Sequence, residues 1–179
     1  TGRDGDLFFD DSSNQFFISD GSTAGGVPLV LHYIRNVVSA SADTTLTVAQ
    51  SGSVCTGNKA DGITITLPAA ATGLTYAVHV GTTITSGNFT ITAASSADTM
   101  QGQLISNDFT DLGSITLLNE SVATVGFDQP AADDHQIVMD GTTKGGKLGS
   151  YVNCTAITAA IWHVDGFLSS DGSLATCFT

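Results

Sequence analysis

Short stretches in which apolar and polar residues alternate recur along the chain. Ile63-Thr-Ile-Thr-Leu67 and the run from Leu74 to Val80 both repeat with a period of two, the spacing at which successive side chains leave opposite faces of a strand. No segment of ten or more residues has helical periodicity, and Ser, Thr, Val and Ile dominate over helix-forming residues. The sequence therefore predicts an all-β protein. Further expected strands cover residues 89–91, 115–117, 123–127 and 137–139.

Turn-forming residues separate these stretches. Asp tolerates a left-handed backbone and Gly adopts it freely, so Asp-Gly pairs indicate hairpins and tight turns. About ten to twelve short strands, spaced roughly 8–12 residues apart, are typical of a sandwich or barrel. The predicted architecture is an antiparallel β-sandwich or a jelly roll. The pairs are Asp4-Gly5, Asp20-Gly21, Asp61-Gly62, Asp140-Gly141, Asp165-Gly166 and Asp171-Gly172.

Charge and hydropathy exclude several classes of protein. Seventeen acidic residues face five Lys and Arg, for a formal net charge of -12, and such a chain lacks the cations that bind phosphate backbones. Nucleic acid is therefore not an expected partner. The apolar content of 41% argues against intrinsic disorder. No run approaches the ~18 apolar residues of a membrane span, so no membrane association is expected.

The first residues differ in composition from the rest. Four of the nine phenylalanines, Phe8, Phe9, Phe16 and Phe17, fall within a short segment that predicts a β-hairpin, with strands at 7–9 and 16–18 and a turn at 11–14. Alternation places neighbouring phenylalanines on opposite faces, so both faces are apolar and need a covering surface. A Gly- and Ser-containing linker follows. We expect residues 1–26 to form a hairpin arm with its linker and residues 27–179 to form the β-sandwich body.

Motifs for catalysis are incomplete. Gly141-Thr-Thr-Lys-Gly-Gly146-Lys147 matches the spacing of a phosphate-binding loop, but Leu148 stands where a magnesium-binding Ser or Thr is required. There is no G-x-S-x-G sequence, and Asp pairs such as Asp133-Asp134 lie in turn-like contexts. No catalytic residue, cofactor or metal site is predicted.

Histidine, cysteine and tryptophan fit structural roles. His32, His79 and His163 stand singly in expected strands, and structural histidines are the default there. The three cysteines are expected to be buried thiols. A disulfide between Cys154 and Cys177 is the alternative. Trp162 is expected to anchor the closing strand in the core, and a contact with a ligand or partner is its alternative role. The cysteines are Cys55, Cys154 and Cys177.

Three segments resemble structural proteins of tailed phages. The first runs Gly5-Asp-Leu-Phe-Phe-Asp and ends in Asp20-Gly-Ser22; it resembles an element of tail-fibre and virion proteins. The second includes Leu67-Pro-Ala-Ala-Ala-Thr-Gly-Leu-Thr-Tyr76 and is similar to capsid decoration, head-fibre and fibre modules of marine and cyanobacterial phages. The third is Ile161-Trp-His-Val-Asp-Gly166 with the end Ala175-Thr-Cys-Phe-Thr179, where Cys177 replaces a common Pro.

The resemblance implies a β-rich, usually trimeric virion module without catalytic residues. We expect a capsid decoration protein on the outer shell, with a homotrimer of the chain and the major capsid protein as partners. The expected interface residues are Phe8, Phe9, Phe16, Phe17 and Trp162. The alternatives are a tail-fibre or receptor-binding module, a bacterial surface β-domain and, more remotely, an enzyme acting on polysaccharide.

Overall fold

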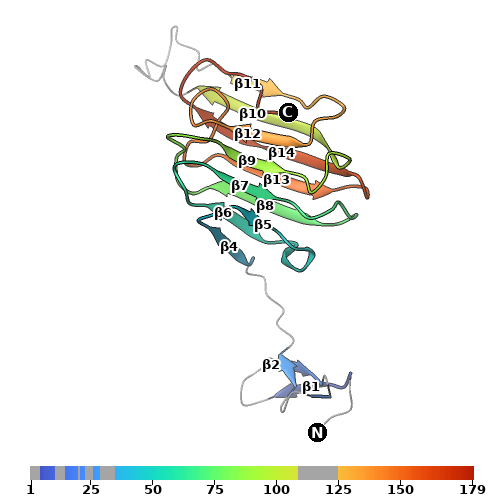
Figure 1. The fold of residues 1–179 in the computed structure, drawn as a ribbon. Coiled ribbons are helices and arrows are strands. Elements are labelled where there is room, and N and C mark those ends of the chain that lie inside the picture. The colour runs from blue at the N-terminus through green and yellow to red at the C-terminus, as the bar shows by residue number, and fades with distance from the viewer. Residues whose placement is uncertain (1–4, 11–14, 20, 23–25, 29–34, 109–124) are drawn as a thin grey trace, which may run out of the picture. The chain divides into compact units, whose positions relative to one another are not determined.

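The chain divides into two units. The structure, a computed structural model, describes residues 5–10, 15–19, 21–22, 26–28, 35–108 and 125–179 (Figure 1). The units are Thr1–Arg35 and Asn36–Thr179; we call them the small unit and the body. The sequence placed the corresponding boundary at 26/27. The expected strand at 115–117 lies outside the described residues.

The small unit is a three-stranded sheet in the order β1-β2-β3. β1 (Leu7–Asp10) pairs antiparallel with β2 (Gln15–Ile18), near the two strands expected from the phenylalanines. β3 (Val27–Pro28) adds to β2 through the pair Ile18 and Val27. Val27 was expected to begin the body, but its strand pairing with Ile18 places it in this first sheet.

The body consists of two β-sheets. Seven strands in the order β11-β10-β14-β13-β8-β6-β4 form one sheet, and four in the order β12-β9-β7-β5 form the other (Figure 1). A single 3-10 turn, η1 (Val48–Gln50), is the helical element of the described residues. The strands of the body are β4 (Val37–Ala40), β5 (Thr44–Thr45), β6 (Val54–Gly57), β7 (Ile63–Thr66), β8 (Thr75–Val80), β9 (Phe89–Thr92), β10 (Thr99–Asp108), β11 (Val125–Asp128), β12 (Gln136–Met139), β13 (Tyr151–Ala156) and β14 (Ile161–Ser170).

Successive strands from β4 to β9 alternate between the two sheets. Within each sheet they pair in parallel, β4 with β6 and β6 with β8 in one, and β5 with β7 and β7 with β9 in the other. Parallel neighbours need a connection that crosses back to the starting end, and here the intervening strand of the opposite sheet provides it. Over residues 37–92 the chain therefore winds in successive turns, and each turn adds one strand to each sheet.

The rest of the body is mostly antiparallel. β13 pairs antiparallel with both β8 and β14, β11 with β10, and β12 with β9, whereas β10 and β14 run parallel over ten residue pairs. The prediction of an all-antiparallel sandwich or jelly roll is therefore wrong for the sheet pairing. Alternation in sequence reports which face a residue occupies and carries no information on strand direction.

One apolar core contains buried residues from both sheets. Ile65 and Phe89 of the four-stranded sheet are fully buried, as are Tyr76, Val152 and Trp162 of the seven-stranded sheet. The period-two pattern produces this core because every second residue of a strand points to the same side. The outward residues of the two sheets remain available to solvent or partners.

Two glycines, Gly102 and Gly166, allow neighbouring strands of the seven-stranded sheet to pack closely against each other's backbone. A Cβ at Gly102 would lie 1.9 Å from the carbonyl oxygen of Val164, and one at Gly166 would lie 2.2 Å from the carbonyl oxygen of Tyr151. Asp165-Gly166 was expected to mark a turn, but both residues lie inside β14. Gly166 is required there by the close backbone of β13 rather than by a reversal of the chain.

The variant Gly102→Ala tests this account of the close contact. Gly102 has φ +133°, and Gly73 has φ +95° with open space around its Cβ position. Gly73→Ala should therefore cost only the left-handed strain of about 1–2 kcal/mol. Gly102→Ala must also separate β10 from β14 and should lower the urea midpoint clearly further. Equal losses in urea unfolding would contradict the steric explanation.

Candidate interaction surfaces

The phenylalanines of the small unit form two cross-strand pairs. Phe8 pairs with Phe17 in the β1–β2 register and Phe9 with Phe16, so the pairs occupy opposite faces of the sheet. The Phe8 and Phe17 ring centroids lie 5.7 Å apart, and those of Phe9 and Phe16 lie 5.0 Å apart. Gly26 lies close to the Phe8 ring.

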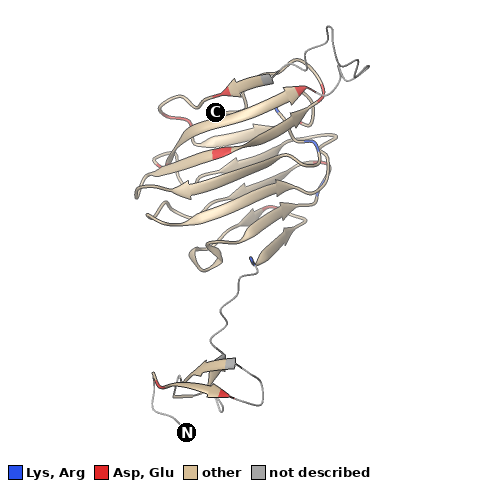
Figure 2. Cartoon of the chain, turned by 180° about the vertical axis from the view of Figure 1, so that it is seen from behind, with Lys and Arg blue, Asp and Glu red and all other residues tan. Residues whose placement is uncertain are grey.

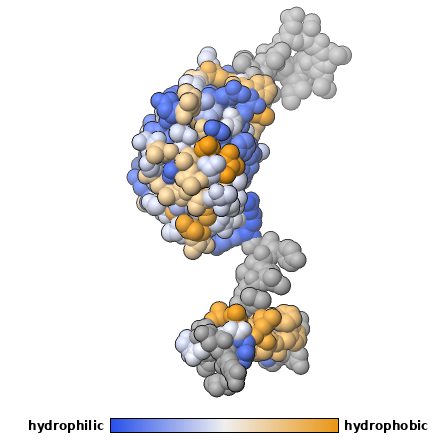
Figure 3. Space-filling view, turned by 90° about the vertical axis from the view of Figure 1, so that its right-hand side faces the viewer, coloured by the Kyte–Doolittle hydropathy of each residue, from blue (hydrophilic) through white to orange (hydrophobic). Residues whose placement is uncertain are grey.

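The Phe9–Phe16 pair keeps much of its apolar surface exposed to solvent. Phe9 and Phe16 are each 46% exposed, and Leu7, Ile18 and Val27 add further exposed apolar surface. Figure 3 shows apolar residues over much of the surface of the small unit. An apolar cluster of this kind is typical of a surface that another molecule covers.

Trp162 does not take part in such a surface. Its side chain has 0% exposure, and its ring packs 5.9 Å from that of Tyr76. The Tyr76 hydroxyl donates a hydrogen bond to the Thr47 carbonyl at 2.8 Å. A side chain without accessible surface cannot contact a partner, which corrects the inclusion of Trp162 among the interface residues. It is a core residue, as its position on an alternating strand indicates.

A row of aromatic and apolar side chains crosses the outer face of the seven-stranded sheet. The strand registers place its members side by side on adjacent strands. Phe127 is 65% exposed at one end, and Tyr151, next to His79 at the other end, is 36% exposed. Sequence reasoning missed this row because its members come one each from five strands, β8, β10, β11, β13 and β14, which are spread over residues 75–170. The aromatic row consists of Phe127, Ile105, Phe167, Tyr151 and His79.

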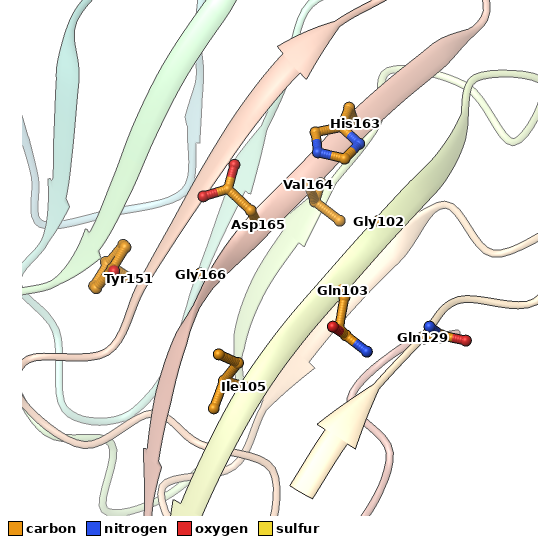
Figure 4. Close-up of a pocket in the computed structure, with 9 residues that line it drawn as sticks. All are labelled: Gly102, Gln103, Ile105, Gln129, Tyr151, His163, Val164, Asp165 and Gly166. Carbon is orange, nitrogen blue, oxygen red and sulfur yellow. The ribbon is translucent and has the colours of Figure 1, made fainter.

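A cavity of about 510 Å³ adjoins this row. Figure 4 shows side chains from β10, β13 and β14, together with Gln129 after β11, around it. The size falls within the range of about 300–1,000 Å³ that small-molecule sites occupy. Its lining combines apolar and polar groups and contains no Lys or Arg. The lining residues are Gly102, Gln103, Ile105, Gln129, Tyr151, His163, Val164, Asp165 and Gly166.

Two contacts fix side chains at this cavity. The Tyr151 ring stacks on the imidazole of His79, with centroids 5.6 Å apart and planes 23° apart. Asn153 Nδ2 donates a hydrogen bond to Asp165 Oδ2 at 2.9 Å. These neighbours restrict the rotamers of Tyr151 and Asp165 before any ligand arrives. Of the three histidines expected to stand singly in strands, His79 lies beside Tyr151 and His163 in the cavity wall, whereas His32 lies outside the described residues.

The segment that matched a phosphate-binding loop is organised around an internal carboxylate. Asp140 Oδ1 accepts hydrogen bonds from the backbone N–H groups of Thr142 at 2.8 Å and Lys144 at 3.0 Å. The Gly145 and Gly146 N–H groups donate to the hydroxyls of Ser170 and Ser150. The amides of this segment are therefore engaged within the protein, and an anion would meet the negative charge of Asp140.

Metal-ligating residues do not gather in the parts of the chain that the structure describes. No three His, Cys, Asp or Glu side chains there come close enough to hold a metal ion. Helices long and apolar enough to cross a membrane are likewise not found among those residues.

Most strand residues carry no charge, and the charged positions lie largely near strand ends (Figure 2).

The three cysteines are buried as free thiols. Burial raises the pKa of the Cys55 thiol to about 11. Burial, with a smaller contribution from the Asp165 charge, raises the pKa of Cys154 to about 12. Burial and the neighbouring Asp128 carboxylate also raise the pKa of Cys177. No Cys154–Cys177 disulfide is present, and thiols of this kind are poor nucleophiles.

Comparisons with known proteins give no assignment. No family model matches the chain, and no curated protein or solved structure matches it significantly. The resemblance to phage proteins therefore rests on the sequence motifs alone.

Acidification should release the contribution of Asp140. Burial raises the pKa of its carboxyl, but the N–H groups of Lys144 and Thr142 and the hydroxyl of Thr143 together hold it below its ordinary value. The lowered pKa stabilises the fold above about pH 4, and this contribution is lost as the pH falls. Asp140→Asn should cost roughly 1 kcal/mol or more in urea unfolding at pH 7 and little at pH 3. Asp61→Asn, which removes an exposed carboxylate 3.6 Å from Lys59, should cost little at either pH. A pH-independent loss in Asp140→Asn would contradict the role of its charge.

Alkaline pH should destabilise the body through its thiols. Their raised pKa values favour the neutral form in the folded state, so this contribution is complete below about pH 9 and is lost above it, as the unfolded thiols ionise first. The free energy of unfolding should fall between pH 9 and 11. The Cys154→Ala variant should show a shallower fall than the parent chain. An identical slope in both would show that other groups cause the decline.

Proposed function

We propose that this chain is a structural protein of a tailed-phage particle, acting as a capsid decoration protein that joins neighbouring shell subunits. Its small unit is the attachment element, and its two body sheets form a sandwich that remains on the outer surface. The observation that carries the proposal is the exposed Phe9–Phe16 pair on a sheet too small to bury it. The motifs shared with virion modules point to the same class.

The physical role follows from buried area. Cementing adds contacts across joints between shell subunits, so that pressure from packaged DNA must break more of them. Stable interfaces of this kind commonly bury over about 2,000 Å² in total, and aromatic side chains supply most of the energy of such contacts. The apolar residues of the small unit are suited to this task when several copies act together in a homotrimer.

Charge supports an outward-facing body. The net charge of -12 gives decorated particles a mutual repulsion that keeps them dispersed. The same charge disfavours contact with packaged DNA. These properties fit a protein of the outer capsid surface.

A receptor-binding role on a tail fibre is the second candidate. The cavity beside Tyr151, with its mixed polar and apolar lining, favours it because a decoration protein needs no small-molecule site. Mass spectrometry of purified particles, separated into heads and tails, distinguishes the two roles. Decoration predicts the chain in heads at a high copy number.

Attachment is tested by the double variant Phe9→Ser/Phe16→Ser. It should lose most binding in co-sedimentation with shells from particles that lack the chain, because the exposed aromatic pair is the proposed anchor. The control Val37→Ser/Val48→Ser changes exposed valines of the body and should bind normally.

A second variant separates attachment from folding. Removing the whole small unit, residues 1–35, should leave a folded body, seen as native fluorescence of the buried Trp162, that neither trimerises in light scattering nor sediments with shells. Undiminished sedimentation of either variant would contradict the proposal.

A further inference from the structure

We propose that the outer face of the seven-stranded sheet binds a neutral oligosaccharide in the cavity between β10, β14 and β13. Tyr151 provides the ring on which one sugar stacks. This inference does not depend on the decoration role, because the cavity belongs to the body and the attachment residues belong to the small unit.

The stacking surface is already held in place. Tyr151 is 36% exposed, and His79 supports one side of its ring at a centroid distance of 5.6 Å. A pyranose has an apolar face of C–H groups, which packs well on a rigid aromatic plane. Ile105 is 38% exposed and lies on β10, which β14 separates from the Tyr151 strand; it lines the same cavity and extends its apolar part.

Polar side chains surround this apolar floor. Gln103, Gln129, His163 and Asp165 line the same cavity (Figure 4). Amides offer both donors and acceptors, and a carboxylate accepts at two oxygens, which is the mixture that adjacent sugar hydroxyls require. Asn153 already holds one oxygen of Asp165 at 2.9 Å, so the carboxylate is oriented and keeps acceptor capacity for a ligand.

The charge of the site restricts the ligand to a neutral sugar. No Lys or Arg lines the cavity, and Asp165 contributes a negative charge within a strongly acidic chain. A phosphate, uronate or sialate would face repulsion without a compensating cation. A hydroxyl-rich neutral chain makes the same hydrogen bonds without that cost.

The lining also favours a sugar over a second copy of the chain. A protein surface that covered this face would have to pair Gln103, His163 and Asp165, because burying a polar group without a hydrogen bond is costly. A hydrated oligosaccharide meets those groups directly or through water.

The test measures binding of the full chain to defined hexasaccharides by isothermal titration and NMR. The neutral probes are maltohexaose, cellohexaose, mannohexaose and chitohexaose, and hexagalacturonate is the anionic probe. We expect at least one neutral probe to bind and the anionic probe not to bind. Binding of none of the neutral probes, or preference for hexagalacturonate, would overturn the proposal.

Variants connect the binding to this face. Tyr151→Ala should weaken the binding by about tenfold or more, because the stacking platform is lost, and Tyr151→Phe should retain it. Val37→Ala, an exposed position on β4 of the same sheet, should have no effect. Unchanged binding in Tyr151→Ala would overturn the proposal. So would dissociation of the oligomer in that variant by light scattering, since the face would then be a subunit contact.

Discussion

Burial of every second strand residue between the two sheets is the constraint on which the structure of the body depends. The alternation in runs such as 63–66 and 75–80 sends Ile65 and Tyr76 into one core and leaves their neighbours outside. This core joins the parallel strands of residues 37–92 to the mostly antiparallel strands that follow, so that the two parts form one body. Trp162 is part of this core, so a contact with a partner or ligand must use residues outside it.

Those outer residues fall into two sets with different chemistry. The small unit exposes hydrocarbon rings with no polar group among the phenylalanines, a surface suited to a protein partner that excludes water. The cavity on the seven-stranded sheet mixes Tyr151 and Ile105 with amides, an imidazole and a carboxylate, a surface suited to a hydroxylated ligand. In the proposed roles, the small unit would attach the protein to a shell and the body would hold a sugar.

The sequence predicted the elements better than their arrangement. The expected strands at 63–67, 74–80, 89–91 and 137–139 correspond to β7, β8, β9 and β12, because alternation, β-branched residues and turn signals are local properties. Strand direction was wrong because it depends on where each connection crosses. Asp165-Gly166 was taken as a turn because the close approach of β13, which requires Gly166, is a property of tertiary structure.

The candidate surfaces show the same division. The clustered phenylalanines were identified because four of them lie within ten residues of one another in the sequence. The aromatic row and its cavity could not be found that way, since Ile105, Phe127, Tyr151 and His163 meet only through the pairing of β10 with β11 and β14 and of β14 with β13. Single residues such as His79 carry no pattern until their neighbours across the sheet are known.

A cryo-electron microscopy map of the particle that carries this chain tests the central claim most directly. The account predicts density for the small unit against the shell, with Phe9 and Phe16 buried in the contact and the cavity beside Tyr151 open to solvent. A map in which the phenylalanines of the small unit touch no other protein, or in which the chain is missing from the particle, would contradict it.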